Sequence, residues 1–241
     1  MAILLKRLPW LLLALAVALG MGTALAWWQF ADRPGPLPGN NDFTAVVLSA
    51  PVTDGSMSLE KAMFKRRSVS DFGPLALEFE EISQLAWAAQ GITDSDGMLR
   101  TAPSADRAYR LTLYLAAQNV NGLDPGIYKY DPYNHQLQGI IAGNKSFALL
   151  LQVKQPVVEH AAAVFIIAGP DISPAEKNHE QQLRFVNLEC GHIAQNLLLQ
   201  ATALNLGSLP MGSFSQSGIK KLLLLEDEEN VYYLVAIGNN P

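Results

Sequence analysis

The chain has 241 residues, 49% of them hydrophobic and 16% charged, and its formal net charge is −5. This composition predicts one well-buried globular domain with an added segment and excludes a largely disordered chain. The acidic balance makes nucleic acid an unexpected partner, and the single cysteine excludes an internal disulfide or a zinc site built on several cysteines.

The first 28 residues have the character of a signal anchor or a signal peptide. Lys6 and Arg7 precede an uncharged stretch over residues 8–28, long enough to cross a bilayer at about 1.5 Å per residue. Ala24-Leu25-Ala26 matches the small-residue pattern of a cleavage site, so both readings stay open. Because the positive charges precede the apolar stretch, we expect the main domain outside the cytoplasm, membrane-anchored or secreted, as in a periplasmic protein.

Residues 29–44 are rich in proline and glycine and predict a tether, which leaves residues 45–241 for the folded domain. Ser58 can cap a short helix with one apolar face made of Leu59, Ala62 and Met63. A second amphipathic helix is expected to begin near Phe79 and to end at Gly91.

Strand patterns dominate the middle of the domain. Alternating apolar residues predict strands at 111–115, 127–130 and 136–141, separated by turn residues. The continuous apolar run over residues 163–168 predicts a central buried strand.

The longest predicted helix runs over residues 177–206 and is expected to end at Gly207. From Ile193 onward it is apolar nearly all round, which predicts burial in the core or in a subunit interface. A helix at 219–225 and a strand at 231–237 should follow. Helices and strands alternate without a repeating unit, so the fold class is α+β: a mixed, mainly antiparallel sheet with helices packed on it and a long buried central helix.

Two short clusters have the chemistry of a ligand site. Arg66, Arg67 and Ser68 offer two guanidiniums and a hydroxyl, which suit a phosphate. The alternative is a solvated charge that complements the carbonyl end of the preceding helix. Ala102-Pro103-Ser104-Ala105 combines small residues with proline, so its backbone can approach a flat ligand. No histidine stands at metal-ligand spacing from a carboxylate or another histidine, and no metal is expected.

Taken in order, six motifs resemble the nitroreductase-like FMN flavoproteins, in particular the subgroup with the azoline dehydrogenases of thiazole/oxazole-modified peptides. The resemblance covers residues of about 45 to 241. The motifs lie at residues 58–69, 80–92, 100–105, 124–130, 189–197 (Glu189-Cys190-Gly191-His192 and the residues after it) and 209–214.

The resemblance implies where FMN would bind. Arg66, Arg67 and Ser68 would hold the phosphate and ribitol end, and Ser70 stands where the family commonly has a basic residue near the polar edge of the flavin. Pro103, Ser104 and Ala105 would reach the flavin of a partner subunit, which implies a homodimer. Pro210, Met211 and Gly212 would lie beside the isoalloxazine, with a backbone N–H facing N5; by themselves these three residues predict only a turn.

The implied function is an FMN-dependent oxidoreductase that passes hydride or electrons between flavin and a small organic molecule, such as a nitro compound, a quinone or an azoline-like group. The flavin itself would carry the chemistry. NAD(P)H is a candidate reductant that an exported domain would not meet, so a quinol or a reduced protein is the alternative donor.

The chain departs from the family pattern at Ser70, Asp106, Arg110, Asn239 and Asn240. These departures keep two other functions open. One is a flavin-free or non-catalytic envelope binding or scaffold module on the same fold. The other is an FMN-binding storage or sensing protein without turnover.

Overall fold

The computed structural model describes residues 44–175 and 177–241. The predicted signal or anchor segment and the tether up to residue 43 lie outside the described residues, so the domain boundaries stay a prediction. Within the described ranges, none of the helices combines the length and the apolar character that a bilayer crossing needs.

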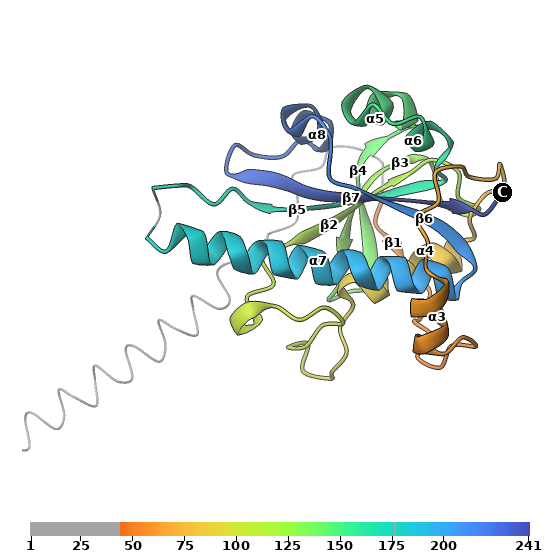
Figure 1. Ribbon diagram of the computed structural model, residues 1–241, viewed down its shortest axis with the longest axis horizontal. Coiled ribbons are helices and arrows are strands. Elements are labelled where there is room, and N and C mark those ends of the chain that lie inside the picture. The colour runs from red at the N-terminus through yellow and green to blue at the C-terminus, as the bar shows by residue number, and fades with distance from the viewer. Residues whose placement is uncertain (1–43, 176) are drawn as a thin grey trace, which may run out of the picture. The chain divides into compact units, whose positions relative to one another are not determined.

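A seven-stranded sheet forms the centre of the fold, in the order β1-β4-β3-β2-β5-β7-β6, with every neighbouring pair antiparallel (Figure 1). Two isolated bridges, Ser68 with Ser208 and Leu77 with Val120, are parallel. The predicted mixed, mainly antiparallel sheet is therefore confirmed. The strands are β1 (Val46–Val47), β2 (Thr112–Ala117), β3 (Gly126–Asp131), β4 (Gln136–Ala142), β5 (Ala163–Pro170), β6 (Leu206–Met211) and β7 (Glu229–Asn239).

Helices cover both faces of the sheet (Figure 1). α3 (Leu59–Lys65), α4 (Phe79–Gln90) and α7 (His179–Ala203) lie on one side, together with the short 3-10 turn η1 (Ala105–Arg107). α5 (Ser146–Val153), α6 (Val157–His160) and α8 (Gln216–Leu223) lie on the other. The α+β class predicted from the sequence is confirmed.

Strand β5 is buried on both faces, as its continuous apolar sequence predicts. Side chains alternate along a strand, so Phe165 and Ile167 join the core beneath α4 and α7. Val164 and Ile166 join a second core beneath α5, α6 and α8. All four side chains are 0% exposed.

Helix α7 ends earlier than the sequence predicted. Asn205 adopts a left-handed φ of 62° and its backbone N–H donates to the Thr202 carbonyl, so the turn forms at asparagine. Asparagine tolerates this conformation better than most residues. Gly207, the predicted end, lies instead in β6, a strand that the sequence did not reveal. From Ile193 onward most of α7 is buried or half-buried, including Ile193, Leu197 and Ala201, and Gln195 is the exposed position among residues 193–203. The N-terminal half of the helix is less covered, and Leu188 there is 53% exposed.

Helix α3 is capped as predicted, but most of its apolar face is exposed. The Ser58 hydroxyl accepts from the backbone N–H of Lys61 at 3.3 Å. Of the predicted inner residues only Ala62 is buried, whereas Leu59 is 56% exposed and Met63 is 55% exposed. Amphipathic spacing shows that a helix has an apolar side, but it does not show whether another part of the same chain covers that side.

Two glycines let an aromatic ring lie against the β6–β7 edge. Gly207 pairs with Gly238, and a methyl group on Gly238 would meet Phe72 atoms at 2.6 and 2.8 Å. We therefore expect Gly238→Ala to lower the free energy of unfolding by about 1–3 kcal/mol, because Phe72 would have to move. Urea denaturation measures this change. Gly55→Ala, where nothing lies within 4 Å, is the control, and equal effects of the two substitutions would contradict the packing argument.

Candidate functional site

The end of α3 runs directly into the edge of the sheet. Arg66 ends the helix with extended backbone angles (φ −49°, ψ 123°), and the Val69 N–H then donates to the Ser208 carbonyl of β6 at 2.9 Å. Ser68 forms a parallel bridge with Ser208. The Arg66–Ser68 cluster and the strand that leads to Gly212 are thus neighbours, although about 140 residues separate them in the sequence.

Pro210 and Met211 belong to the last part of β6 rather than to a turn. Pro210 pairs with Val235 and Met211 pairs with Leu234. The Ser208 carbonyl points away from β7, towards Val69, so position 210, two residues on, also directs its backbone nitrogen away from β7. Proline therefore costs the ladder no hydrogen bond there. Met211 is buried, and Gly212 is exposed just beyond the strand.

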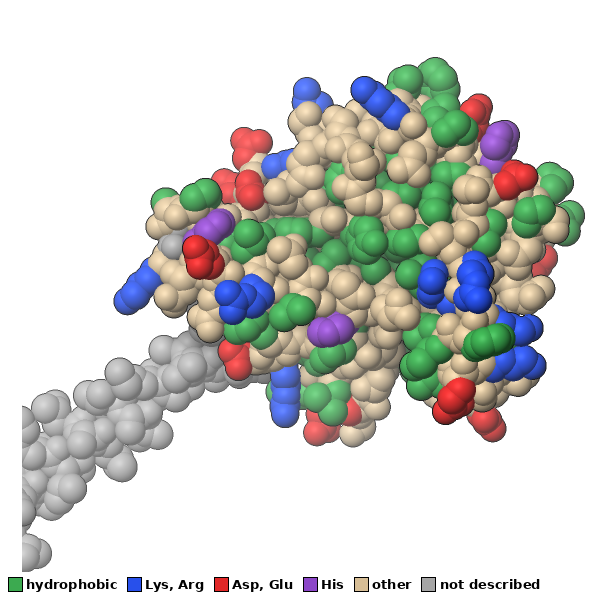
Figure 2. Space-filling model, in the orientation of Figure 1, with side chains coloured by type: hydrophobic (Ala, Val, Ile, Leu, Met, Phe, Trp, Pro, Cys, Tyr) green, Lys and Arg blue, Asp and Glu red, His purple; other side chains and the backbone are tan. Residues whose placement is uncertain are grey.

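The two arginines differ in what engages them. Arg67 Nη1 donates to the carbonyls of Phe64 at 2.9 Å and Arg66 at 2.7 Å, which is the helix-end role weighed as the alternative for this pair. Arg66 is half-buried, and within the described part of the chain no hydrogen bond or ion pair engages its guanidinium. Figure 2 shows Lys and Arg side chains gathered at the α3 end of the molecule. Arg66 is therefore available to bind an anion here.

The C-terminal asparagines have structural partners. Asn239 Nδ2 donates to the carbonyls of Leu75 at 3.1 Å and Ala76 at 3.2 Å, and Asn240 Nδ2 donates to the carbonyl of Asn205 at 2.7 Å. These bonds tie the chain after Ser70 to the β6–β7 edge. Ser70 itself is exposed. The asparagines therefore support the site's backbone and add no cation to it.

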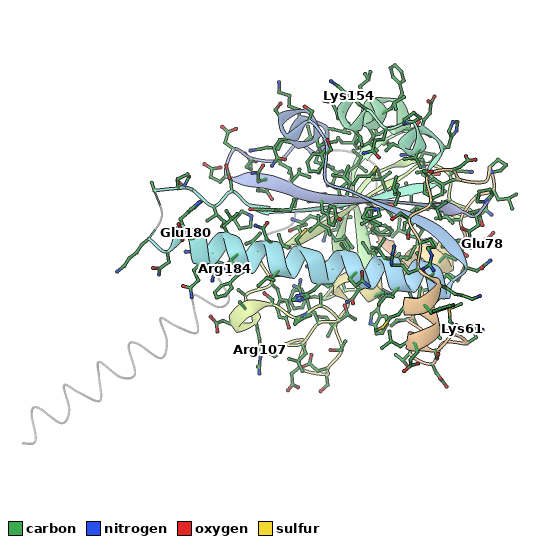
Figure 3. All side chains as sticks on the ribbon, viewed as in Figure 1. Lys61, Glu78, Arg107, Lys154, Glu180 and Arg184 are labelled. Carbon is green, nitrogen blue, oxygen red and sulfur yellow. The ribbon has the colours of Figure 1, made fainter. Side chains whose placement is uncertain are left out.

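The Pro103-Ser104-Ala105 cluster lies elsewhere. The Ser104 hydroxyl contacts Glu189 in the N-terminal half of α7, and η1 begins at Ala105. Figure 3 shows Arg107, at the end of η1, and Lys61, on α3, far apart towards opposite ends of α7. One chain therefore does not bring residues 103–105 together with residues 66–68.

The segment after Ser104 has a strained backbone that the sequence did not reveal. Asp106, Arg107 and Tyr109 have positive φ values of 53°, 55° and 44°. Each such conformation costs a non-glycine residue roughly 1–2 kcal/mol. Backbone strain of this kind gathers at functional sites, where surrounding contacts hold it in place.

Glu189 makes one of those contacts, and no sequence pattern indicated a role for it. It is 4% exposed, and its Oε2 accepts from the Ser104 hydroxyl at 2.5 Å. Its Oε1 has no partner with hydrogen-bond geometry, although the Leu111 N–H is close enough to act on the carboxyl. Burial raises the pKa of Glu189 above its ordinary value, and the Ser104 hydroxyl, the Leu111 amide, Arg100 and Arg110 oppose that rise.

Its neighbour Cys190 packs in the core. Burial, aided by Glu189, raises the pKa of the Cys190 thiol to about 12, so the reactive thiolate is scarce at neutral pH. Cys190 therefore has a packing role. Among residues 44–175 and 177–241, no group of three or more His, Cys, Asp and Glu side chains is placed to hold a metal ion.

The raised pKa of Glu189 predicts a pH-dependent stability. A carboxyl whose pKa is higher in the folded state contributes fully below its unfolded value, near 4.5, and that contribution is lost as pH rises through the folded value. Glu189→Gln keeps an acceptor for Ser104 but cannot ionise, so it avoids the cost of a buried charge that raises the pKa of Glu189. We therefore expect the Tm of the variant, relative to the unchanged protein, to rise between pH 4 and pH 8. A difference that stays constant with pH would contradict this assignment.

Comparison with known proteins agrees with this fold. The model of the nitroreductase family matches residues 63–239. A Methanocaldococcus jannaschii protein whose name places it among the nitroreductases is 34% identical over 172 residues, covering 71% of this chain and 86% of that protein.

Solved structures show the same similarity. A protein from Ralstonia eutropha, described as a nitroreductase, superimposes with a TM-score of 0.69 at 26% identity, over 86% of this chain and 96% of that one. One from Anabaena variabilis gives 0.72 at 26% identity, but this chain spans only 45% of its length while 86% of this chain is covered. A chain of the E. coli microcin synthetase McbBCD complex, solved with truncated pro-MccB17 bound, gives 0.63 at 18% identity, over 90% of this chain and 82% of that one, which shows the fold alone.

The family match covers both predicted clusters and the β6–β7 edge, and it agrees with the family that the sequence motifs resemble. The chain belongs to the nitroreductase family, whose members are generally flavin-dependent oxidoreductases.

Proposed function

We propose that this protein is an FMN-dependent oxidoreductase acting on a small organic substrate. The observation that supports this most directly is the Arg66 guanidinium, which has no partner within the described residues. The Val69–Ser208 backbone bond joins the segment after Arg66 to β6, and the exposed Gly212 follows directly after that strand. A cation for a phosphate and an open backbone for a flat ring system then lie along one sheet edge.

These residues fit the cofactor as follows. Arg66 would bind the phosphate, with Ser68 as a neutral donor and the nitrogens of Arg67 other than Nη1 as a second source of charge. Ser70 would lie near the polar edge of the flavin, and Pro210, Met211 and Gly212 beside its ring. Bound FMN would supply hydride and electron transfer, while the protein would bind it and exclude water from it.

We propose a two-fold homodimer with two equivalent sites. Residues 103–105 lie away from residues 66–68 within one chain, so a second copy would have to supply them. Exposed apolar side chains on α3 and α7 support such an interface: Leu59, Met63, Phe64, Phe185 and Leu188. Light scattering on the purified protein checks this prediction. A flavin-loaded monomer would contradict it.

The substrate class remains that of the sequence resemblance: a nitro compound, a quinone or an azoline-like group. The predicted signal or anchor supports placing the domain outside the cytoplasm, where a quinol or a reduced protein would replace NAD(P)H as donor. An alkaline phosphatase fusion at the C-terminus tests this location, because that reporter is active only after export.

The experiment that tests the function is flavin uptake by the full-length chain, purified in mild detergent. We expect absorbance between 350 and 500 nm after incubation with FMN and gel filtration, and turnover with artificial dyes or quinones when a reductant is supplied. A protein that takes up no flavin would be the envelope binding or scaffold module. A protein that binds flavin without turnover would have a storage or sensing role.

A further inference from the structure

The Ser104 hydroxyl has no proton to offer a flavin. A serine hydroxyl carries one proton, and here it is donated to Glu189 Oε2 at 2.5 Å. The oxygen also accepts from the Tyr109 N–H at 2.9 Å. Any contact of this segment with a ligand would therefore come from the exposed Pro103 and from the backbone. The side chain of Ser104 instead connects the segment to helix α7.

The segment needs such a connection because its backbone is strained. Asp106, Arg107 and Tyr109 all adopt left-handed conformations, and these relax when nothing opposes them. Ser104 spans this stretch by accepting from Tyr109. Arg100 supports it from the other side: its guanidinium lies 4.6 Å from the centre of the Tyr109 ring, and its backbone N–H donates to the Tyr109 hydroxyl at 3.2 Å.

Glu189 connects this segment to helix α7, which packs in the main core. It lies in a helix of 25 residues, and the residues after it in α7, including Ile193 and Leu197, belong to the main core. A carboxyl that is 4% exposed, with one oxygen lacking a partner, is unfavourable for folding in itself. An apolar residue would fill the same place at less cost, so what Glu189 adds is the acceptor for Ser104.

We propose that Glu189 is a positioning residue for the flavin site, holding residues 103–109 through the Ser104 hydroxyl in the conformation that a second copy's flavin would contact. This rests on the proposed FMN-binding dimer for its ligand, but the ordering of the segment can be measured without flavin. The residue acts through Ser104 and touches no cofactor.

Three variants of the full-length protein test the proposal: Glu189→Leu and Ser104→Ala, which remove the hydrogen bond, and Glu189→Gln, which keeps an acceptor. Glu180→Leu, exposed on the same helix, and Ser217→Ala, exposed on α8, are matched controls (Glu180 and Arg107 are labelled in Figure 3). The first readout is the rate of tryptic cleavage after Arg107 in the native protein. The second is the Kd for FMN from quenching of its fluorescence.

We expect Glu189→Leu and Ser104→Ala to speed cleavage after Arg107 and to raise the Kd for FMN by about tenfold, as the loss of a buried hydrogen bond predicts. For Glu189→Gln and for the two controls, the cleavage rate and the Kd for FMN should stay within about threefold of the wild-type values. This rescue separates positioning by the acceptor from a general loss of packing. If Glu189→Leu does not fold, the comparison of Ser104→Ala with Glu189→Gln is sufficient.

Three results would overturn the proposal. They are unchanged cleavage in Ser104→Ala, faster cleavage with an unchanged Kd for FMN, and a Glu189→Gln variant as impaired as Ser104→Ala. If the unchanged protein binds no FMN, the proposed function fails, and cleavage alone decides whether Glu189 orders the segment. Faster cleavage in Ser104→Ala with rescue in Glu189→Gln would then support that ordering, and its absence would reject it.

Discussion

Replacing Arg66 with alanine is expected to weaken FMN binding by about ten- to a hundredfold. The guanidinium of Arg66 has no partner among the described residues, so the substitution leaves the fold intact and removes only a charged donor to the phosphate. A hydrogen bond to a charged group contributes about 1.5–3 kcal/mol, which sets the size of the effect. Fluorescence titration with FMN measures it.

Two further variants sharpen this test. Arg67→Ala should weaken FMN binding less and should also destabilise the end of α3, because Arg67 Nη1 bonds the carbonyls of Phe64 and Arg66. Lys221 is exposed on α8, on the other face of the sheet. Lys221→Ala also removes one positive charge and should leave the affinity for FMN unchanged. Equal losses from Arg66→Ala and Lys221→Ala would mean that only the overall charge matters and that the proposed site is wrong.

Replacing Phe165 with alanine should lower the free energy of unfolding by about 3–5 kcal/mol, the usual cost of removing a large core ring. Phe165 is 0% exposed in the middle of β5, where strands on both sides and the helices α4 and α7 leave little room for the cavity to collapse. A domain of this kind is stable by only about 5–15 kcal/mol, so the loss is a large fraction of the total. Urea denaturation followed by circular dichroism measures it.

Phe147→Ala is the matched control, because the same ring is 65% exposed on α5. Its effect should stay within about 0.5 kcal/mol, as for most surface substitutions. Comparable losses from the two variants would show that burial does not govern the stability of this sheet.

The sequence determined the parts of the fold that depend on short-range patterns. The apolar run of β5, the alternation in β2 to β4, and the Ser58 and Gly91 helix ends all have local physical causes, and the structure has each of them. Residue order was enough to identify the family, because its motifs follow one another at characteristic positions. The Arg66 and Arg67 cluster could be named for the same reason.

Only the tertiary structure revealed the pairings between distant residues. Strand β6 escaped prediction because it contains Pro210 and owes its form to pairing with β7. The different states of Arg66 and Arg67 follow from the direction in which α3 ends, which local spacing does not specify. The Ser104–Glu189 bond joins residues 85 positions apart, so no local pattern could reveal it. The sequence by itself indicated which residues are candidates for a flavin site. Packing around one sheet edge and along α7 decided which of these candidates lack partners in the described residues and which hold other groups in place.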